Sequence, residues 1–526
     1  MKTLIQNARI IDGSGHPAYS GSVGIENGKL VLSNLPDTAE TVIDAKGHEL
    51  APGFIDAHSH GDRLLGKDFG DLCKVNHGVT TQIAGQCGHT EAPGEKAYRS
   101  ARDAGKDPYR AAEAGALGCW SSFADYADTL PKRLNTALFA GFNTIRIAVM
   151  GYTDRKPTKA EVAEMQALLI DAMEHGAFGM SSGLAYIPGT YTDTEDVVEI
   201  AKVMAPYGGI YTTHMRNESF DLVNSVKEAV EIGRRAGVAV NISHFKAMGR
   251  GNWGTVDEAI AVIDEARAEG LQVTVDQYPY NCSMTSLYPS MPPWYFTEGV
   301  PKVMELIQDP AIRRKIRREM EDPSTPYENL YLNAGGFGGI TACGAPAMPE
   351  AEGKTIEELA ALQGKDPFDA FFDLLIATGG SVSAVYHSIG DADILKIIRL
   401  PYAMVGSDGV VRSATEKVHP RGWGAMVRAI NLFTKEQPVL TLEEMIRKIT
   451  WLPAKTYGLT GKGEIREGMD ADLVLFDYAH LEDRATYQHP TELAGGIEAV
   501  FVGGEIVYEN GNLTGRTPGK IIRHRV

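Results

Sequence analysis

Short apolar runs alternate with turn residues at both ends of the chain. Near the N-terminus, Asn27-Gly28 separates two such runs, and Asn-Gly in this setting is a strong hairpin signal. Near the C-terminus, Gly503-Gly504 separates another pair. Neither end has enough strands for a core of its own. We therefore predict that residues 1–51 and 456–526 join into one small β-domain.

Between about residues 52 and 455, strand-like apolar runs alternate with amphipathic helical stretches, which is typical of βα units around a parallel sheet. The predicted strands are residues 54–57, 79–83, 145–149, 178–180, 210–213, 238–242, 273–275, 382–386 and 402–405. These are one more than an eight-stranded barrel needs, so one of them, such as the run before His387, lies outside the barrel or distorts its closure. The predicted fold class is α/β, a distorted TIM-type (β/α)8 barrel with the small β-domain attached.

Residues 283–345 break this rhythm with several prolines, a basic run and a glycine-rich run, and we predict an insertion that caps one end of the barrel. The basic run at residues 312–318 is interpreted as a solvated helix face, not a nucleic-acid patch, because the chain is acidic overall. Two helices of the predicted barrel have a clear start signal in the sequence, because Thr158 and Thr192 each begin an N-terminal capping signature.

The amino-acid composition of the chain limits the kinds of molecule that it is expected to bind. The 526 residues are 43% hydrophobic and carry a net charge of −17, so the chain can build a large core and would repel phosphate backbones and anionic lipids. Five cysteines without a C-x-x-C pair argue against a disulfide framework. No secretory signal or membrane-spanning run is apparent. We expect a cytoplasmic protein with a small-molecule substrate and neither nucleic acid nor membrane as a partner.

Metal-capable residues follow several predicted strands, where a barrel places its catalytic groups. His58 and His60 follow the first strand and, being two residues apart, can face the same side. Cys87, His214 and His244 follow later strands. A cysteine with two histidines matches the three protein ligands of a catalytic zinc site, which keeps its fourth position open.

Asp408 lies in Gly-Ser-Asp-Gly after the last predicted strand. Aspartate before glycine is a common turn element. At the end of an apolar strand level with the histidines, however, the carboxylate can accept a proton from a water and donate it to a leaving nitrogen. We therefore predict that Asp408 is the catalytic acid and base.

Two signatures resemble the amidohydrolase superfamily: residues 52–60 (Pro-Gly-Phe-Ile-Asp-Ala-His-Ser-His) and the C-terminal residues 463–474. Five further stretches resemble the N-acyl-D-amino-acid deacylases, also called D-aminoacylases. They are residues 85–88 with 92–93, residues 181–189, residues 243–246, residues 276–280, and residues 406–409 with 419–421. The resemblance covers nearly the whole chain in family order, and it implies hydrolysis of N-acyl-D-amino acids to a carboxylate and a free D-amino acid.

The resemblance also implies a metal centre. One zinc ion would be held tightly by Cys87, His214 and His244, while His58 and His60 would line a second, weaker position. Many superfamily members bridge two metals with a carboxylated lysine from the fourth strand. Residues 179–183 here contain no lysine, so the Cys87 thiolate would take that place.

For the substrate, the resemblance assigns a small set of residues to the carboxylate of the acylamino acid. They are Tyr186, Lys246, Tyr280, Ser286 and Arg421. A guanidinium binds a carboxylate in a bidentate manner and a lysine adds a point charge. Arg412 is an alternative to Arg421. The side chain and acyl group preferred, the number of metals in the active form and the oligomeric state stay open.

Three other functions fit the sequence less well. Residues 179–183 fit the G-x-S-x-G pattern of serine hydrolases, but Pro188 and Gly189 follow where that motif needs a helix. A cyclic-amide hydrolase of the dihydroorotase or hydantoinase kind would share the His-x-His and the final aspartate, yet it usually carries the bridging lysine. A non-catalytic structural protein on the same barrel is disfavoured by the complete ligand set.

Overall fold

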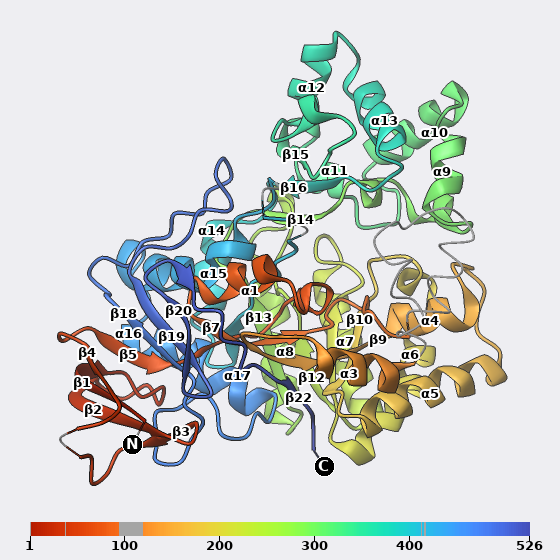
Figure 1. The fold of residues 1–526 in the computed structure, drawn as a ribbon. Coiled ribbons are helices and arrows are strands. Elements are labelled where there is room, and N and C mark those ends of the chain that lie inside the picture. Colours follow the sequence, from red (N-terminus) through yellow and green to blue (C-terminus); the bar gives the residue numbers. More distant parts are fainter. Residues whose placement is uncertain (1, 37, 94–118, 412, 415–416, 526) are drawn as a thin grey trace.

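The structure, a computed structural model, describes residues 2–36, 38–93, 119–411, 413–414 and 417–525. Figure 1 shows a central body of strands and helices, a β-sheet at one side that contains the N-terminus, and a group of helices that projects from the opposite end. None of the described helices is both long and apolar enough to cross a membrane.

A parallel barrel forms the central body. Its strands are β6 (Phe54–Asp56), β7 (Val79–Ala84), β8 (Asn135–Leu138), β9 (Ala140–Gly141), β10 (Gly179–Gly183), β11 (Ile210–His214), β12 (Ala239–Ile242), β13 (Val273–Gln277) and β17 (Ala403–Val405). Because β8 and β9 are one interrupted strand, they make eight positions around the barrel. The two ends of the sheet meet where the amide of Ala57 donates to the carbonyl of Val405 at 3.2 Å. The predicted distorted barrel is confirmed.

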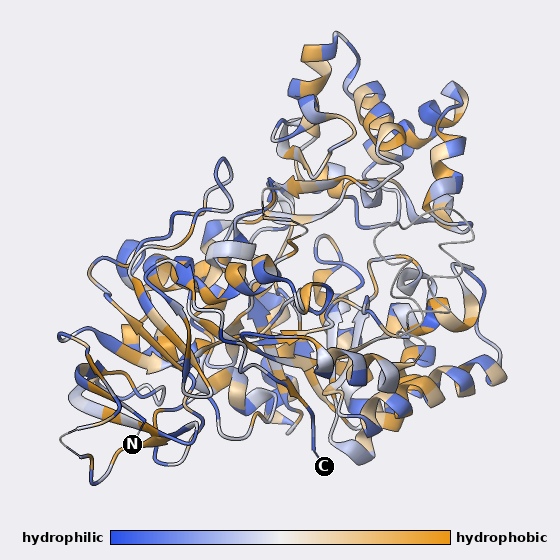
Figure 2. Ribbon diagram, in the orientation of Figure 1, coloured by the Kyte–Doolittle hydropathy of each residue, from blue (hydrophilic) through white to orange (hydrophobic). Residues whose placement is uncertain are grey.

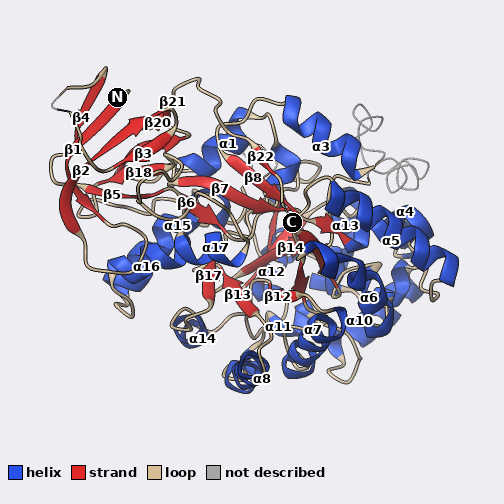
Figure 3. Cartoon of the chain, turned by 90° about the horizontal axis from the view of Figure 1, so that it is seen from below, coloured by secondary structure: helices blue, strands red, loops and turns tan. Residues whose placement is uncertain are grey.

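Helices surround these strands, as Figure 3 shows from below. They are α1 (Asp68–Val75), α3 (Trp120–Thr129), α4 (Phe142–Met150), α5 (Lys159–Glu174), α6 (Thr194–Ala201), α7 (Leu222–Ala236), α8 (Val256–Ala268), α14 (Asp391–Ile397), α15 (Arg421–Asn431), α16 (Leu442–Ile449) and α17 (Trp451–Thr456). The outer helices carry both apolar and polar residues along their length (Figure 2). Thr158 caps α5 in a capping box with Glu161, whereas the N-cap of α6 is Asp193, not Thr192.

One predicted strand is wrong and one was missed. Residues 145–149 form part of helix α4, despite their β-branched side chains, because the helix begins after Gly141 and buries Phe142 and Ile145. The strand at this place in the barrel is β8–β9. Its polar residues conceal it in the sequence: buried Asn135 donates to Asp472 at 3.0 Å, and other strand residues have similar internal partners.

The two ends of the chain share a nine-stranded sheet. From the N-terminal side come β1 (Thr3–Ile10), β2 (Tyr19–Glu26), β3 (Lys29–Val31), β4 (Thr41–Asp44) and β5 (Glu49–Pro52), and from the C-terminal side β18 (Leu473–Phe476), β19 (Ile497–Val502), β20 (Glu505–Glu509) and β21 (Asn512–Leu513). Strands β5 and β18 join the two sets. Asn27 and Gly28 have φ values of 51° and 74°, as a tight hairpin turn requires. The last strand, β22 (Ile521–Ile522), differs from the expectation for residues 456–526, because it pairs with β8 of the barrel.

The insertion is longer than predicted. Strands β14 (Ser283–Ser286), β15 (Ile340–Cys343) and β16 (Ser383–Tyr386) form an antiparallel sheet, so the insertion runs to residue 386 instead of 345. The run before His387 therefore lies outside the barrel. The helices of the insertion are α9 (Val300–Leu306), α10 (Pro310–Glu321), α11 (Leu330–Asn333), α12 (Ile356–Gln363) and α13 (Pro367–Ala377). The basic run belongs to α10, where Arg313 and Arg317 form ion pairs with carboxylates on and beside α13.

Candidate metal centre

The candidate ligands lie at the carboxyl ends of the parallel strands. His58 and His60 follow β6, Cys87 follows β7, and His214 is the last residue of β11. His244 and Asp408 follow β12 and β17 in the same way. The structure therefore brings to one mouth of the barrel residues that are up to 350 positions apart (58 to 408) in the sequence.

Cys87, His214 and His244 offer three ligand atoms that lie within 4.8 Å of one another. Nδ1 of His214 is 2.9 Å from Nε2 of His244, and that Nε2 is 3.3 Å from Sγ of Cys87. A tetrahedral zinc ion holds two nitrogen donors about 3.3 Å apart, and a nitrogen and a sulfur donor about 3.5 Å apart. The three residues therefore fit a zinc ion.

Backbone strain is concentrated at this site. Cys87, His244 and Asp408 have φ values of 55°, 35° and 48°, in the left-handed region that residues other than glycine seldom adopt. Such conformations cost on the order of 1–3 kcal/mol each and persist where the surrounding structure imposes them. The loops at the ends of three strands thus hold these side chains in position for a purpose other than stability.

The thiol of Cys87 is prepared for metal binding. Burial alone would raise its pKa, but the positive charges of His58 and His244 hold that pKa well below the usual value of a thiol. The thiolate is the form of cysteine that binds metals.

A second group shares Cys87 with the first. His58, His60, Cys87 and Asp408 also offer ligand atoms within 4.8 Å of one another. Nε2 of His58 is 3.4 Å from Sγ of Cys87, and Nε2 of His60 is 3.1 Å from Oδ1 of Asp408. The Cys87 sulfur therefore lies between the two candidate metal positions, and β10 carries no lysine that could bridge them.

Glu218 is a residue of this site that the sequence did not reveal. Its Oε1 is 2.9 Å from Nδ1 of His244, and its Oε2 is 3.6 Å from Nε2 of His214 and 2.5 Å from Nζ of Lys246. Burial would raise the pKa of Glu218, but Lys246 and the two histidines lower it to about 2. A carboxylate on the far nitrogen of a ligating histidine fixes the tautomer and the ring orientation. The four-residue spacing from His214 was the available signal.

Asp408 is held as a carboxylate. Its Oδ2 is 3.0 Å from Nη1 of Arg421, and its Oδ1 faces His60. Burial acts in the opposite direction, yet Arg421 and His60 keep the pKa of Asp408 well below its usual range. A buried ionised carboxylate at the barrel mouth can accept a proton.

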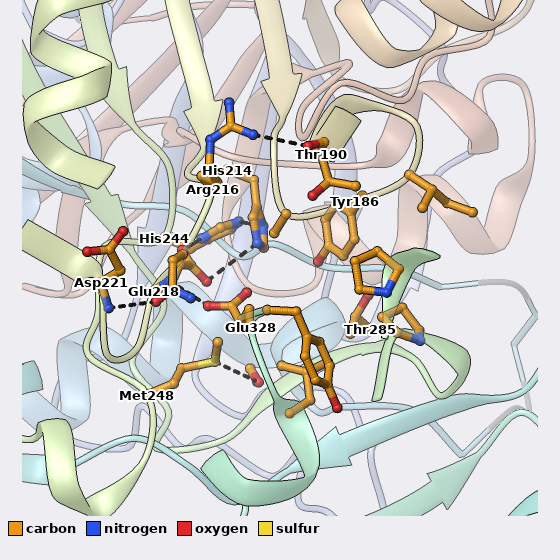
Figure 4. A pocket seen from close by; sticks show the side chains of 18 of the residues that line it. Tyr186, Thr190, His214, Arg216, Glu218, Asp221, His244, Met248, Thr285 and Glu328 are labelled. Atoms are coloured by element: carbon orange, nitrogen blue, oxygen red, sulfur yellow. Dashed lines mark hydrogen bonds and ion pairs between the residues drawn. The ribbon is translucent and has the colours of Figure 1, made fainter. Parts of the chain in front are cut away.

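A cavity of about 380 Å³ opens beside these residues (Figure 4). Of the residues predicted to bind substrate, Tyr186 and Lys246 line it, whereas Tyr280, Ser286 and Arg421 are not in its wall. Arg421 lies behind Asp408, and Ser286 accepts a hydrogen bond from Tyr386 through its carbonyl at 2.9 Å.

Tyr278 occupies the place expected for Tyr280. The ring of Tyr278 lines the cavity, 4.6 Å from the guanidinium of Arg421 and 5.9 Å from Nζ of Lys246. Tyr280 instead packs against His419, with 4.9 Å between the ring centres. Arg412, the alternative to Arg421, lies outside the described residues.

The serine pair of residues 179–183 has a structural role. Both serines lie within β10, not in a turn before a helix. Ser181 donates a hydrogen bond to the carbonyl of Gly85 at 2.6 Å, and Ser182 donates to Thr213 at 2.9 Å. The strand–turn–helix geometry of a serine nucleophile is not present here.

Comparison with known proteins agrees with this geometry. Residues 41–508 match the model of the "Amidohydrolase family". The chain is 33% identical to D-aminoacylase of Alcaligenes xylosoxydans xylosoxydans, over 99% of this chain and 97% of that protein. A solved structure of D-aminoacylase superposes with a TM-score of 0.82 at 31% identity, covering 99% of both chains.

A second solved structure is equally similar. N-acyl-D-glutamate deacylase from Bordetella bronchiseptica, complexed with zinc and a phosphonate inhibitor, superposes with a TM-score of 0.81 at 30% identity and covers 99% of both chains. The family resemblance seen in the motifs is thus confirmed. The chain belongs to the amidohydrolase family and, within it, to the group of D-aminoacylases and N-acyl-D-amino-acid deacylases.

Proposed function

We propose that this protein hydrolyses the amide bond of N-acyl-D-amino acids in a zinc-dependent reaction, giving a carboxylate and a free D-amino acid. The observation that carries the proposal is the meeting of Cys87, His214 and His244 around one point, with the ionised Asp408 at the same barrel mouth. The relatives named D-aminoacylase or N-acyl-D-amino-acid deacylase, one of them solved with zinc, support the same reaction.

Cys87, His214 and His244 would hold the zinc ion, and His58 and His60 would line a second, weaker position. When bound, zinc supplies a Lewis acid that lowers the pKa of a water molecule and polarises the amide carbonyl. Through its contacts with Nδ1 of His244 and Nε2 of His214, Glu218 would keep both rings oriented to hold the ion.

Asp408 moves the proton. Its carboxylate accepts a proton from the attacking water and then donates it to the nitrogen of the departing amine. Arg421 binds Oδ2 of Asp408, which leaves Oδ1 directed at His60 and His58, at 3.1 and 3.6 Å. Arg421 therefore also sets the direction in which the carboxylate works.

The carboxylate of the substrate would bind near Lys246 and Tyr186, both in the cavity wall. Tyr278 is a further candidate, because its hydroxyl is buried without a hydrogen-bond partner among the described residues. Arg421 could contribute charge from behind Asp408. Fixing the carboxylate at one place while the side chain enters the cavity would select one hand of the amino acid.

A hydrolysis screen with zinc supplied tests the proposal. N-acetyl-D- and N-acetyl-L-amino acids of the same side chain are compared by release of free amine. We expect turnover of D-substrates, loss of turnover on chelation and recovery with zinc. A preference for L-substrates would contradict the assignment of handedness but not of the metal, and inactivity toward every acylamino acid would contradict the function.

The cyclic-amide hydrolase remains a weaker alternative, because β10 lacks the bridging lysine. Dihydroorotate and hydantoins in the same screen would reveal it. We also propose a cytoplasmic location, since the cysteines form no disulfide bond in the described structure, as expected in a reducing compartment.

A further inference from the structure

The cavity has two walls of different character. The barrel wall contains the polar and charged residues Tyr186, His214, Arg216, Glu218, Asp221, His244, Lys246, Tyr278 and Asp408 among others, and the insertion wall is made of residues between 283 and 330. We propose that the insertion wall selects N-acyl-D-amino acids with neutral apolar side chains, such as D-Met, D-Leu or D-Phe, and rejects those with acidic side chains. This inference rests on the proposed function and names the substrate class.

The insertion wall is mainly apolar. Among its described residues are Met284, Met291, Phe296 and Leu330, and Met248 and Ile187 continue the same surface from the barrel loops. A flexible methionine-rich surface accommodates apolar side chains of several shapes. The volume of about 380 Å³ is sufficient for an acylated amino acid of ordinary size.

Neither permanent cation of the described wall is free to bind the carboxylate of an acidic side chain. Arg216 pairs with Glu228 through Nη2 and Nε at 2.8 and 3.0 Å and donates to the carbonyls of Thr190 and Thr192. Figure 4 shows its bond to Thr190. Lys246 is 2.5 Å from Oε2 of Glu218 and is needed for the carboxylate that all substrates share. No wall cation in the described structure is thus left for a second carboxylate.

Glu328 makes the wall unfavourable for an acidic side chain. It is the one charged side chain that the described insertion wall contributes, and its Oε1 accepts a hydrogen bond from the amide of Glu218 at 2.5 Å. In Figure 4 its carboxyl group lies beside Glu218, inside the cavity. With or without its proton, Glu328 offers no positive charge. A substrate carboxylate would therefore meet two acidic residues in a partly buried place.

A panel of N-acetyl-D-amino acids tests this inference on the full-length, zinc-loaded protein. The panel contains the D-Met, D-Leu, D-Phe, D-Glu, D-Asp, D-Lys and D-Arg compounds. We expect kcat/KM for the best apolar substrate to exceed that for D-Glu by about 100-fold, the effect of an unpaired buried charge. A higher kcat/KM for an acidic or a basic substrate would overturn the inference.

Two variants test the role of Glu328. Replacing Glu328→Gln keeps the shape and removes the carboxylate, and Glu328→Lys supplies a cation. We expect the ratio of kcat/KM between D-Met and D-Glu to fall about tenfold in the first and further in the second. The control is Glu305→Gln, which makes the same change at an exposed side chain of α9 outside the cavity wall. An unchanged ratio in both Glu328 variants would contradict the assignment.

The proposed selectivity for the side chain of the substrate can be tested separately from the proposed hydrolysis. If no compound of the panel is hydrolysed, the same compounds are titrated as ligands into the zinc-loaded protein. Tighter binding of N-acetyl-D-Met than of N-acetyl-D-Glu would support the wall's selectivity although the proposed function had failed. Equal or reversed affinities would overturn the selectivity as well.

Discussion

The barrel wall and the insertion wall of the cavity are built in different ways. The barrel wall carries ionised and metal-capable side chains on strained loops at the ends of strands. The insertion wall carries apolar side chains on a separate antiparallel sheet and its helices. Under the proposed function, the barrel would perform the reaction and the insertion would choose the substrate, so that one could change without the other.

The largest effect is expected at the residue shared by both metal groups. Cys87→Ala removes the thiolate that would contact either metal, and we expect zinc content and turnover to be lost together. Zinc is measured by atomic absorption on the purified protein. Cys343→Ala, which removes a buried thiol from β15 of the insertion, is the control and should retain zinc. Full zinc content in Cys87→Ala would contradict the assignment of Cys87 as a zinc ligand.

Asp408→Asn should separate chemistry from metal binding. The amide keeps the size of the side chain but cannot accept the proton, so we expect kcat to fall by about a thousandfold. Zinc bound by Cys87, His214 and His244 should stay at the level of the unaltered protein. A rate near that of the unaltered protein would show that another group moves the proton.

A core substitution in the insertion tests whether the insertion wall can be disturbed without affecting the barrel wall. Phe371 in α13 is fully buried and packs against Phe337 and Phe372, so Phe371→Ala should lower the free energy of unfolding by about 3–5 kcal/mol. We expect the preference among D-substrates to weaken while zinc content is retained. Denaturant unfolding and the substrate panel measure the two effects. If Phe371→Ala keeps its fold but loses zinc, the two walls of the cavity are not independent.

The smallest of these effects is expected for Glu218→Gln. The histidine rings lose a carboxylate partner, and zinc affinity should fall by about 10–100-fold. Competition with a chelator of known affinity measures it. Glu305→Gln on α9 is the matched control, because the Glu305 side chain is exposed and is not in the cavity wall. Equal losses of zinc affinity in the two variants would contradict the assignment of Glu218 to orienting the histidine ligands.

The meeting of the candidate ligands at one place could be predicted from the sequence better than the elements that carry them. His58, Cys87 and His244 could be recognised because each follows an apolar run and belongs to a motif, and the barrel rule places such positions together. The strand at residues 135–141 could not be recognised, because its polar residues are satisfied by partners distant in the chain. Residues 145–149 were misleading for the opposite reason, since apolar β-branched residues also suit a buried helix.

Distances within the site depend on tertiary contacts that no local pattern encodes. Glu218 lies in an irregular loop, and only the meeting of β11 and β12 gives it two histidine partners. Tyr278 and Tyr280 are equivalent in the sequence, yet the path of the chain after β13 leaves one in the cavity and the other against His419. The full extent of the insertion was equally beyond prediction, because its third strand comes a hundred residues after the first (283 to 383).

The pairing of β22 with β8 and of β18 with β5 has a consequence for biosynthesis. Strands β5 and β8 are synthesised early, and each lacks one neighbouring strand until residues beyond about 470 leave the ribosome. The β8 edge is therefore covered late, and the growing chain must keep this edge from aggregating for most of translation.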